Sequence, residues 1–512
     1  MKKNFNFFLF AIILFCIPSV LGLLHNGFPL TDDGNWMVIR FSSFYENLRD
    51  GQFPVRFLSR LNHGYGYPVA DFLYPGFMYL GSLVHILGFS FVNTIKVIFG
   101  ISLIASAIFS FLWLRKIFDQ FSAFIGALVY LYFPYHLYDI YKRGSAGEIL
   151  SLAVLPFVLW SIENKNIFLT SAGLSLLVIS HNTLALIFIP FIVLYTILRN
   201  KKEFKNLFIS LILGFGISSF FWIPAIFDLQ FTVFIETKIS DWSKYFADIK
   251  MIGVSTLFIL LLIIIIMFLK KTEIQKDRFY LSILILGILS VFFASSFSFI
   301  FWNILPVSFI QFPFRVLSLS IPCFALLSAL AVSKTEKNKK IILGSVIALL
   351  TFFSSVIYLF PASYQYLPDT FYSTNQDTTT VKNEYMPKWV KSIPTKFYES
   401  KIENLSGDEE ISIEKISPNN IIFNTNLKEK RIIAVNTVYF PGWEASINQK
   451  KEEVNFNNPA GIINLHLEKG ENKVSVYFTE TPIRILSNFI SFLSLSSLLI
   501  LAYLIKYRKF KV

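Results

Sequence analysis

The sequence predicts a mainly α-helical, polytopic membrane protein with a smaller antiparallel β domain outside the membrane. Of its 512 residues, 54% are hydrophobic and 15% are charged, whereas a soluble domain carries about 25% charged residues. Apolar runs of about 17 or more residues recur along the chain, which is typical of membrane-spanning helices. A polar segment with alternating apolar residues near the C-terminus predicts the β domain.

The same composition excludes several classes of protein. A mean hydropathy of +0.57 excludes a cytosolic enzyme and a disordered chain. The two cysteines, Cys16 and Cys323, both lie in apolar runs, which excludes a disulfide scaffold and a cysteine-based metal site. The net charge of +13 does not call for a nucleic-acid partner, because Lys and Arg accumulate in the cytoplasmic loops of membrane proteins.

The apolar runs predict about twelve membrane spans. The first, at 5–24, lacks a small-x-small cleavage site, so we expect an uncleaved anchor. The run at 74–88 is short and rich in Gly and aromatic residues; if it lies at the interface, the basic loops and both termini face the cytoplasm, as the positive-inside rule favours. The remaining spans are expected at 92–113, 121–138, 147–161, 166–180, 182–198, 206–222, 252–269, 279–297, 314–333, 341–360 and 483–505.

These spans divide the chain into three predicted parts. Residues 1–360 form the transmembrane domain, whose outer loop at 25–90 contains an amphipathic helix near 35–50. Met37, Phe41, Phe44 and Leu48 share one face of that helix, which suits the membrane surface. Residues 361–482 form an extracytoplasmic β-sandwich-like domain, and residues 483–512 form the final helix and a basic cytoplasmic tail.

Ionisable residues are almost absent from the middle of the predicted spans, which argues against a proton-coupled pump or an ion channel. Instead, polar and ionisable residues from five separate helix ends fall on the outer side. Such a cluster suits chemistry on a charged lipid headgroup. Its members are Asp32, Asp33, Arg40, Asp139, Lys142, Arg143, Glu148, His181, Asn182, Asp228, Glu236, Gln311 and Arg315.

The residues of this cluster also have structural interpretations. Asp32 or Asp33 can cap the helix that follows, and one aspartate can do so while the other acts chemically. Arg143 can anchor the chain at the interface or pair with Glu148.

Two more residues and one loop also have structural interpretations. His181 can be an interfacial histidine whose hydrogen bonds are satisfied, and Arg315 can extend its charge to the membrane surface. The stretch at 64–68 is most simply a turn-rich loop.

A resemblance to a known family rests on short stretches in a fixed order: DDGNWMVIR, GQFPVRF, GYGYPVADFLYPG, YKRGSAGE, SHNTLAL, FWIPAIFD and QFPFRVLSL. They resemble bacterial membrane proteins described as 6-pyruvoyl-tetrahydropterin synthase-related, which in turn resemble the GT-C superfamily of membrane glycosyltransferases. The run YFPGW at 439–443 is similar to the outer β domain of YfhO-like membrane proteins. The label implies no pterin chemistry, because the sequence has no histidine set for that soluble enzyme's zinc site.

The resemblance implies an inverting glycosyltransferase in the bacterial cytoplasmic membrane. GT-C enzymes take a sugar from a polyprenyl-phosphate-linked donor, and a carboxylate in the first outer loop acts on the acceptor. Carried onto this sequence, that carboxylate is Asp33, with Asp32 second. The implied partners are the lipid-linked donor, membrane lipids, and an outer glycan, lipid or protein acceptor. Many relatives have a histidine shortly after the aspartate, where this sequence has residues 35–37, Asn-Trp-Met.

Glycosyl transfer assigns chemical roles to the cluster. A loop carboxylate can deprotonate an acceptor hydroxyl, and cationic donors stabilise a phosphate leaving group. Glu148 can orient Arg143 or hold a divalent cation such as Mg²⁺ or Mn²⁺. The predicted phosphate-binding residues are Arg143, Lys142, Arg315 and His181, and the predicted sugar or lipid groove contains Tyr65, Tyr67, Tyr74, Asn182 and Gln311.

Two other functions remain open at this point. A lipid or glycan transporter would move its substrate without making a glycosidic bond. A non-catalytic scaffold in envelope assembly would keep the fold and lack the reaction, and the absence of the histidine after Asp33 is compatible with it.

Overall fold

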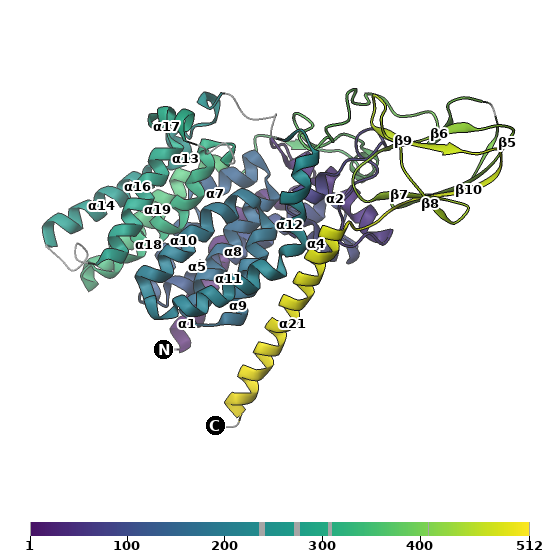
Figure 1. Ribbon diagram of the computed structural model, residues 1–512. Helices are drawn as coiled ribbons and strands as arrows, with labels where there is room; N and C mark the ends of the chain where they lie inside the picture. Colours follow the sequence, from purple (N-terminus) through teal and green to yellow (C-terminus); the bar gives the residue numbers. More distant parts are fainter. Residues whose placement is uncertain (1, 235–240, 271–276, 306–309, 408, 511–512) are drawn as a thin grey trace.

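The computed structural model describes residues 2–234, 241–270, 277–305, 310–407 and 409–510, so Glu236 lies outside the described chain. A bundle of helices with a separate antiparallel β domain confirms the predicted fold class (Figure 1). The helices of the bundle are α1 (Lys2–Leu24), α5 (Phe91–Leu114), α6 (Gln120–Leu131), α7 (Pro134–Tyr138), α8 (Ala146–Glu163), α9 (Ile167–Ser180), α10 (Asn182–Asn200), α11 (Phe204–Ile217), α12 (Ser219–Asp228), α13 (Ile249–Ile252), α14 (Val254–Lys270), α16 (Arg278–Ala294), α17 (Phe299–Ile304), α18 (Leu317–Ser333), α19 (Lys337–Ser355) and α21 (Pro482–Phe510).

Each predicted span coincides with one or two of these helices. By length and composition, 7 helices in the described ranges are able to cross a membrane, or up to 9 if each bent pair counts as one span. Helices α6 and α9 are apolar but shorter. Helix α4 (Gly76–Ile86) has 11 residues, or about 16 Å, and this is too short for a hydrocarbon core of about 30 Å.

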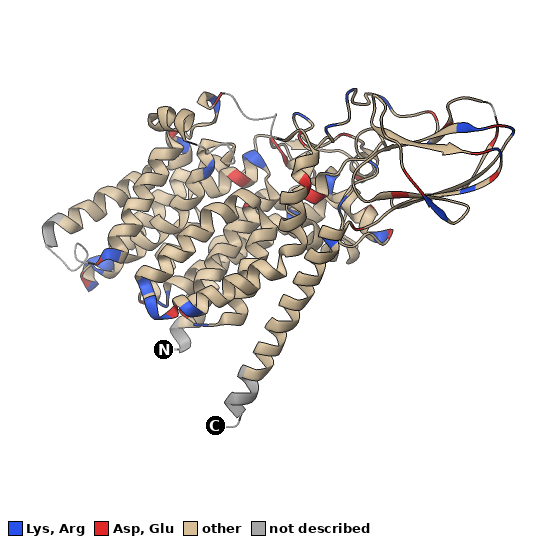
Figure 2. Cartoon of the chain, viewed as in Figure 1, with Lys and Arg blue, Asp and Glu red and all other residues tan. Residues whose placement is uncertain are grey.

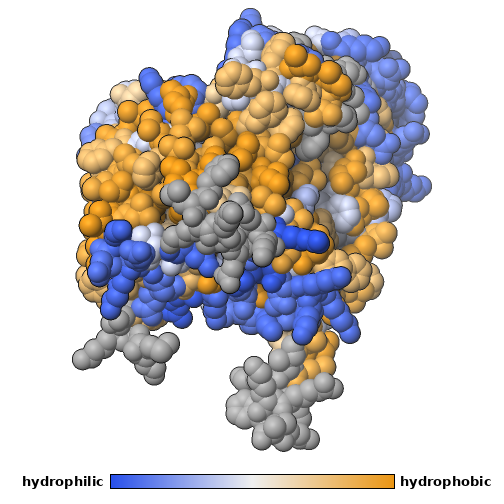
Figure 3. Space-filling view, turned by 90° about the vertical axis from the view of Figure 1, so that its left-hand side faces the viewer, coloured by the Kyte–Doolittle hydropathy of each residue, from blue (hydrophilic) through white to orange (hydrophobic). Residues whose placement is uncertain are grey.

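Charged residues gather at the two ends of the bundle and are sparse in its middle (Figure 2). Figure 3 shows an apolar face of the bundle bordered by hydrophilic residues. We call the two ends the β-domain end and the opposite end. Both chain termini lie at the opposite end (Figure 1), as expected for an even number of crossings.

Helix α2 (Gly34–Arg49) forms where an amphipathic helix is predicted, but its predicted place on the membrane surface is wrong. It packs against α4, α5 and α20 (Asp369–Thr374), and most of its residues are buried. Even Arg40 is only 3% exposed, because its guanidinium donates to the Thr379 carbonyl at 2.7 Å. The apolar face that was predicted to contact lipid is covered by α4 and the start of α5, where Phe41 packs on His85 and Phe91 and Phe44 packs on Tyr79.

The β domain contains two antiparallel sheets, seen as two layers in Figure 1. Buried and more exposed residues alternate along β5, β9 and β10, as expected when one face of each sheet covers a core. The first sheet has the order β4 (Ile411–Ser417), β5 (Asn420–Leu427), β10 (Gly470–Phe478), β7 (Trp443–Ile447), β8 (Lys450–Glu452), and the second has the order β3 (Ile402–Asn404), β6 (Arg431–Val438), β9 (Ile462–Leu467).

A buried ionic network joins this domain to the bundle. Arg484 of α21 is 0% exposed; its Nε donates to Asp228 at 2.9 Å and its Nη2 to Asp71 at 3.4 Å. Asp71 also binds Arg56 at 3.3 Å. A third nitrogen of Arg484 donates to the carbonyl of Pro441, in the YFPGW run, at 2.8 Å. The first loop, α12, α21 and the β domain therefore meet at one point.

This network predicts a pH-dependent stability. Burial and the neighbouring Asp71 carboxylate raise the pKa of Asp228 from 3.8 to about 7, so between these values the folded protein binds a proton that the unfolded chain releases. We expect stability to fall by about 1.4 kcal/mol per pH unit across that window. Thermal unfolding of the detergent-solubilised protein at several pH values measures this. Asp228→Asn should flatten the profile, and an unchanged profile in the variant would contradict the prediction.

Candidate functional site

Two segments far apart in sequence meet at the β-domain end of the bundle. The backbone amides of Asp32 and Asp33 donate to the carbonyls of Lys142 and Arg143, at 2.9 and 2.8 Å. Gly144, with φ of +69°, makes this approach possible: a Cβ there would lie 2.3 Å from the Thr31 hydroxyl. The preceding residues form a π-helical turn, η1 (Asp139–Arg143), a conformation found often at functional sites.

The side chains at this junction form a charged cluster that extends to a third segment. Arg143 Nη2 binds Asp33 Oδ2 at 3.2 Å, and Arg143 Nη1 binds Asp139 at 3.3 Å and Glu148. Arg315 binds the same Oε1 atom of Glu148 at 2.9 Å. Glu148 is therefore the hub that holds two guanidinium groups side by side.

Burial differs strongly among the members of the charged cluster. Arg143, Arg315, Asp139 and Glu148 are at most 4% exposed, whereas the side chain of Asp33 is 30% exposed. Asp33 is thus the carboxylate of the cluster that solvent or a second substrate can reach. An Arg pair beside a reachable carboxylate can bind a phosphate and accept a proton at neighbouring positions.

Aromatic rings support both guanidinium groups. The rings of Phe312 and Phe314 lie 5.3 and 5.1 Å from Cζ of Arg143, and Phe312 lies 4.9 Å from Cζ of Arg315. Gln311, predicted to line a groove, accepts a hydrogen bond from Arg315 at 3.2 Å. The segment before α18 therefore positions the cations by ring contacts as well as by charge.

His181 lies against the cluster as a neutral ring. Its Nδ1 accepts a hydrogen bond from the Leu184 amide at 3.3 Å, which caps α10 and leaves Nε2 protonated. Nε2 lies 3.8 Å from Glu148 Oε1, beyond hydrogen-bond distance. Tyr74 packs on the His181 ring with centroids 4.5 Å apart, while Asn182 turns away and donates to the Phe72 carbonyl at 3.0 Å.

Several structural alternatives are resolved by these contacts. Thr31, and not an aspartate side chain, accepts a hydrogen bond from the Gly34 amide at the start of α2. Arg315 does not extend to the membrane surface, because it is buried on Glu148. Asp32 and Lys142 form an exposed pair at 3.4 Å, next to the cluster.

Tyr65 and Tyr67 have partners outside the charged cluster, and both carboxylate oxygens of Glu148 have partners within the protein. Tyr67 is 0% exposed, and its hydroxyl is hydrogen-bonded to Thr380 and accepts from the Tyr385 amide. Tyr65 instead packs against Tyr398, with ring centroids 5.3 Å apart. At Glu148 both guanidinium groups bind Oε1, and the Tyr135 hydroxyl donates to Oε2. No group of three metal-ligating side chains occurs in the described parts of the chain.

Sequence reasoning missed two roles in this site. The sequence places Asp139 among the outer charges without indicating its function. Its spacing of four residues from Arg143 is nevertheless typical of an ion pair within one helix. The Tyr135 hydroxyl donates to Glu148 Oε2 at 3.2 Å, and no local pattern indicates this contact.

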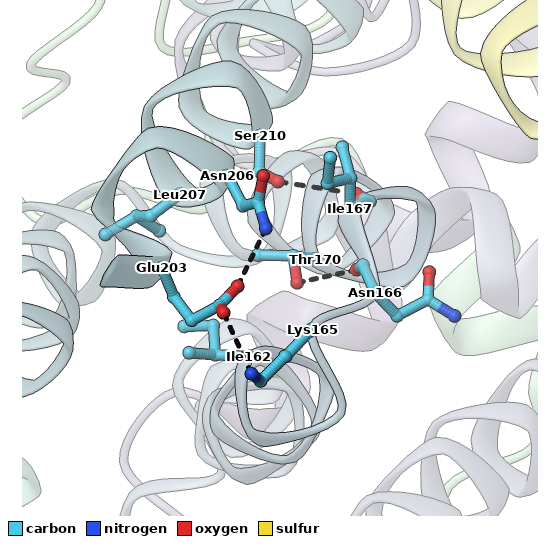
Figure 4. A pocket seen from close by; sticks show the side chains of 9 residues that line it. All are labelled: Ile162, Lys165, Asn166, Ile167, Thr170, Glu203, Asn206, Leu207 and Ser210. Carbon is cyan, nitrogen blue, oxygen red and sulfur yellow. Dashed lines mark hydrogen bonds and ion pairs between the residues drawn. The ribbon is translucent and has the colours of Figure 1, made fainter. Parts of the chain in front are cut away.

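Two hollows lie outside the charged cluster. An apolar groove of about 450 Å³ runs between α1, α6 and α19, lined by Phe15, Phe124, Leu128, Tyr132, Ala348 and Phe352 among others. At the opposite end, a hollow of about 10 Å³ lies around Lys165 and Glu203, whose side chains pair at 3.2 Å; Figure 4 shows the side chains that line it. The small hollow holds about one water and is separated from the cluster by the length of α8.

Comparisons with solved structures find proteins with a similar arrangement of helices. The oligosaccharyltransferase AglB of Archaeoglobus fulgidus, in complex with an inhibitory peptide and a dolichol-phosphate, has a TM-score of 0.48 and 13% identity over 76% of this chain and 58% of its own. The arabinofuranosyltransferase AftD from Mycobacteria has a TM-score of 0.47 and 14% identity, over 71% of this chain and 27% of its own. ArnT from Cupriavidus metallidurans, bound to undecaprenyl phosphate, has a TM-score of 0.44 and 16% identity, over 73% and 68%.

The chain thus spans less than two thirds of the archaeal enzyme's length. No curated protein matches it in sequence. A family model, described as a 6-pyruvoyl-tetrahydropterin synthase related domain of membrane proteins, matches residues 73–361, which is more than half of the chain. The protein therefore belongs to the family of 6-pyruvoyl-tetrahydropterin synthase-related membrane proteins.

Proposed function

We propose that the protein is a membrane glycosyltransferase that moves a sugar from a polyprenyl-phosphate-linked donor to an acceptor outside the cytoplasm. The observation that carries the proposal is the convergence of Arg143 and Arg315 on Glu148, next to the reachable Asp33 carboxylate. Two guanidinium groups offer the charge and the hydrogen bonds that a phosphate needs. We assign the role of base to Asp33, which removes the proton of the acceptor hydroxyl.

The reaction we propose is a displacement at the anomeric carbon. The acceptor oxygen forms the new bond, the bond to the phosphate oxygen breaks, and the phosphate leaves with its electron pair beside Arg143 and Arg315. The proton passes to Asp33. A β domain at the same end of the bundle suits an acceptor that approaches from outside the membrane, with the basic opposite end in the cytoplasm.

The apolar groove supports a lipid-linked donor. Tyr132 lines the groove and is followed by α7, whose last residue, Tyr138, packs on Phe314 at 6.0 Å. Phe314 in turn contacts Arg143. We therefore assign the donor's hydrocarbon chain to the groove and its phosphate to the charged cluster, with α7 between them.

Filling the groove tests this assignment. We expect Ala348→Trp to raise the KM for a long-chain donor about tenfold, because the lost burial of about two methylene groups corresponds to about 1.4 kcal/mol. The KM for a short-chain donor should stay unchanged. Val346→Trp is the matched control, since Val346 is on the same helix, 38% exposed, and does not line the groove. Equal effects of both variants on both donors would contradict the assignment.

The function itself is tested in liposomes that contain the purified protein and radiolabelled polyprenyl-phosphate sugars. Formation of a glycosidic bond with a supplied glycan or lipid acceptor supports transfer, and movement of the donor without a new bond identifies a transporter. One observation favours a non-catalytic scaffold: both guanidinium groups already bind carboxylates of the protein. A scaffold predicts that no polyprenyl phosphate binds and that Arg143→Ala and Arg315→Ala change no such binding.

A further inference from the structure

Asp139 is a buried carboxyl group that the proposed reaction does not use. Its side chain is 0% exposed, and Oδ1 accepts a hydrogen bond from Arg143 Nη1 at 3.3 Å. Oδ2 has no hydrogen-bond partner within the described ranges. Backbone contacts hold the residue in place, since the Gly144 amide donates to the Asp139 carbonyl at 2.9 Å. Buried polar atoms without a hydrogen-bond partner are uncommon in folded proteins. We therefore expect a bound molecule to supply the partner of Oδ2.

The charge balance of the cluster indicates which partner is missing. With all groups ionised, the carboxylates of Asp139, Glu148 and the partly exposed Asp33 would face two guanidinium groups, and both guanidinium groups already bind Glu148. Burial and the neighbouring Glu148 raise the pKa of Asp139 well above its ordinary value. The titratable and charged groups that face Asp139 are Asp33, Tyr135, Tyr138, Arg143, Glu148 and Arg315.

We propose that Asp139 stays protonated and that its Oδ2 hydroxyl donates a hydrogen bond to the phosphate of the lipid-linked donor. The inference rests on the proposed function, and makes Asp139 a third phosphate-binding residue after Arg143 and Arg315. Phosphate oxygens only accept hydrogen bonds, so an O–H group suits them and an ionised carboxylate repels them. A neutral O–H group also adds a hydrogen bond to the phosphate. A third buried cation in its place would add a further positive charge to the site.

The experiment measures binding of a polyprenyl phosphate methyl diester to the full-length protein in nanodiscs between about pH 6 and pH 9. This probe keeps a single charge over the whole range, so a change in affinity reports on the protein. We expect wild-type affinity to fall as the pH rises, by up to about tenfold per unit once Asp139 ionises. Asp139→Asn, which keeps a neutral donor, should bind within about twofold of wild type at pH 6 and lose the pH dependence.

Two further variants separate a specific contact from a structural effect. Asp139→Ala removes the donor and should bind about tenfold more weakly at pH 6. Glu163→Gln is the matched control, because Glu163 lies at the far end of α8 and is paired with Arg199. It should follow the wild-type profile throughout.

The outcomes distinguish this inference from the proposed function. Asp139→Ala binding as tightly as wild type at pH 6 overturns the inference, as does an Asp139→Asn variant that keeps a wild-type fall in affinity with rising pH. Stronger binding with Mg²⁺ in wild type and not in Asp139→Asn identifies a cation site at Oδ2 instead. Absence of binding by wild type at every pH overturns the lipid-linked donor itself and the inference with it.

Discussion

Asp33→Asn is expected to lower the rate of sugar transfer by at least about 100-fold, the lower range for the loss of a general base. Of the three carboxylates in the charged cluster, Asp33 is the one with an exposed side chain, at 30%, so the acceptor hydroxyl can reach it. Asparagine keeps the size of the side chain but cannot take the proton. The measurement is kcat and KM for a polyprenyl-phosphate sugar in liposomes.

Asp33→Asn should transfer sugar more slowly and still fold like the wild-type protein. Arg143 keeps Glu148 and Asp139 as partners when Asp33 becomes neutral, so the thermal unfolding temperature and the donor KM should remain close to wild type. Asp32→Asn is the matched control, since Asp32 is 53% exposed and pairs with Lys142 on the outside of the cluster. Full activity of Asp33→Asn would falsify the assignment of the base.

Glu148→Ala is expected to destabilise the protein by about 3–5 kcal/mol, the usual effect of leaving a buried charge unpaired. Arg315 is 3% exposed and binds the Glu148 carboxylate, so its guanidinium group is left buried without that partner, whereas Arg143 keeps Asp33 and Asp139. Thermal unfolding of the purified protein in detergent measures the change. We expect the triple variant Arg143→Met, Glu148→Met, Arg315→Met to recover much of the stability and none of the activity.

A control for this prediction lies on the same helix. Glu163 is 13% exposed, and its partner Arg199 is 31% exposed, so Arg199 stays solvated when the carboxylate is lost. Glu163→Gln keeps an acceptor for the buried Tyr195 hydroxyl and should therefore cost about 1 kcal/mol or less. Equal destabilisation by Glu148→Ala and Glu163→Gln would contradict the central role of Glu148.

The sequence alone determined the fold class, because each of its signals is local. An apolar run forms its helix in a membrane regardless of its neighbours, and alternation such as that of residues 463–467 specifies a strand with one buried face. The positions of Asp33, Arg143, Glu148 and Arg315 near helix ends followed from the same local reading. The prediction that they lie on one side of the membrane followed from the number of spans between them.

The tertiary structure decided which of these residues touch, because contacts between distant segments leave no local pattern. Asp33 reaches Arg143 through backbone hydrogen bonds between segments about 110 residues apart, and Arg484 meets Asp71 across 413 residues. Residues beyond 361 cover Tyr67, and α4, α5 and α20 together cover α2. Periodicity says which face of a helix is apolar, but only the packed chain determines whether lipid or protein covers that face.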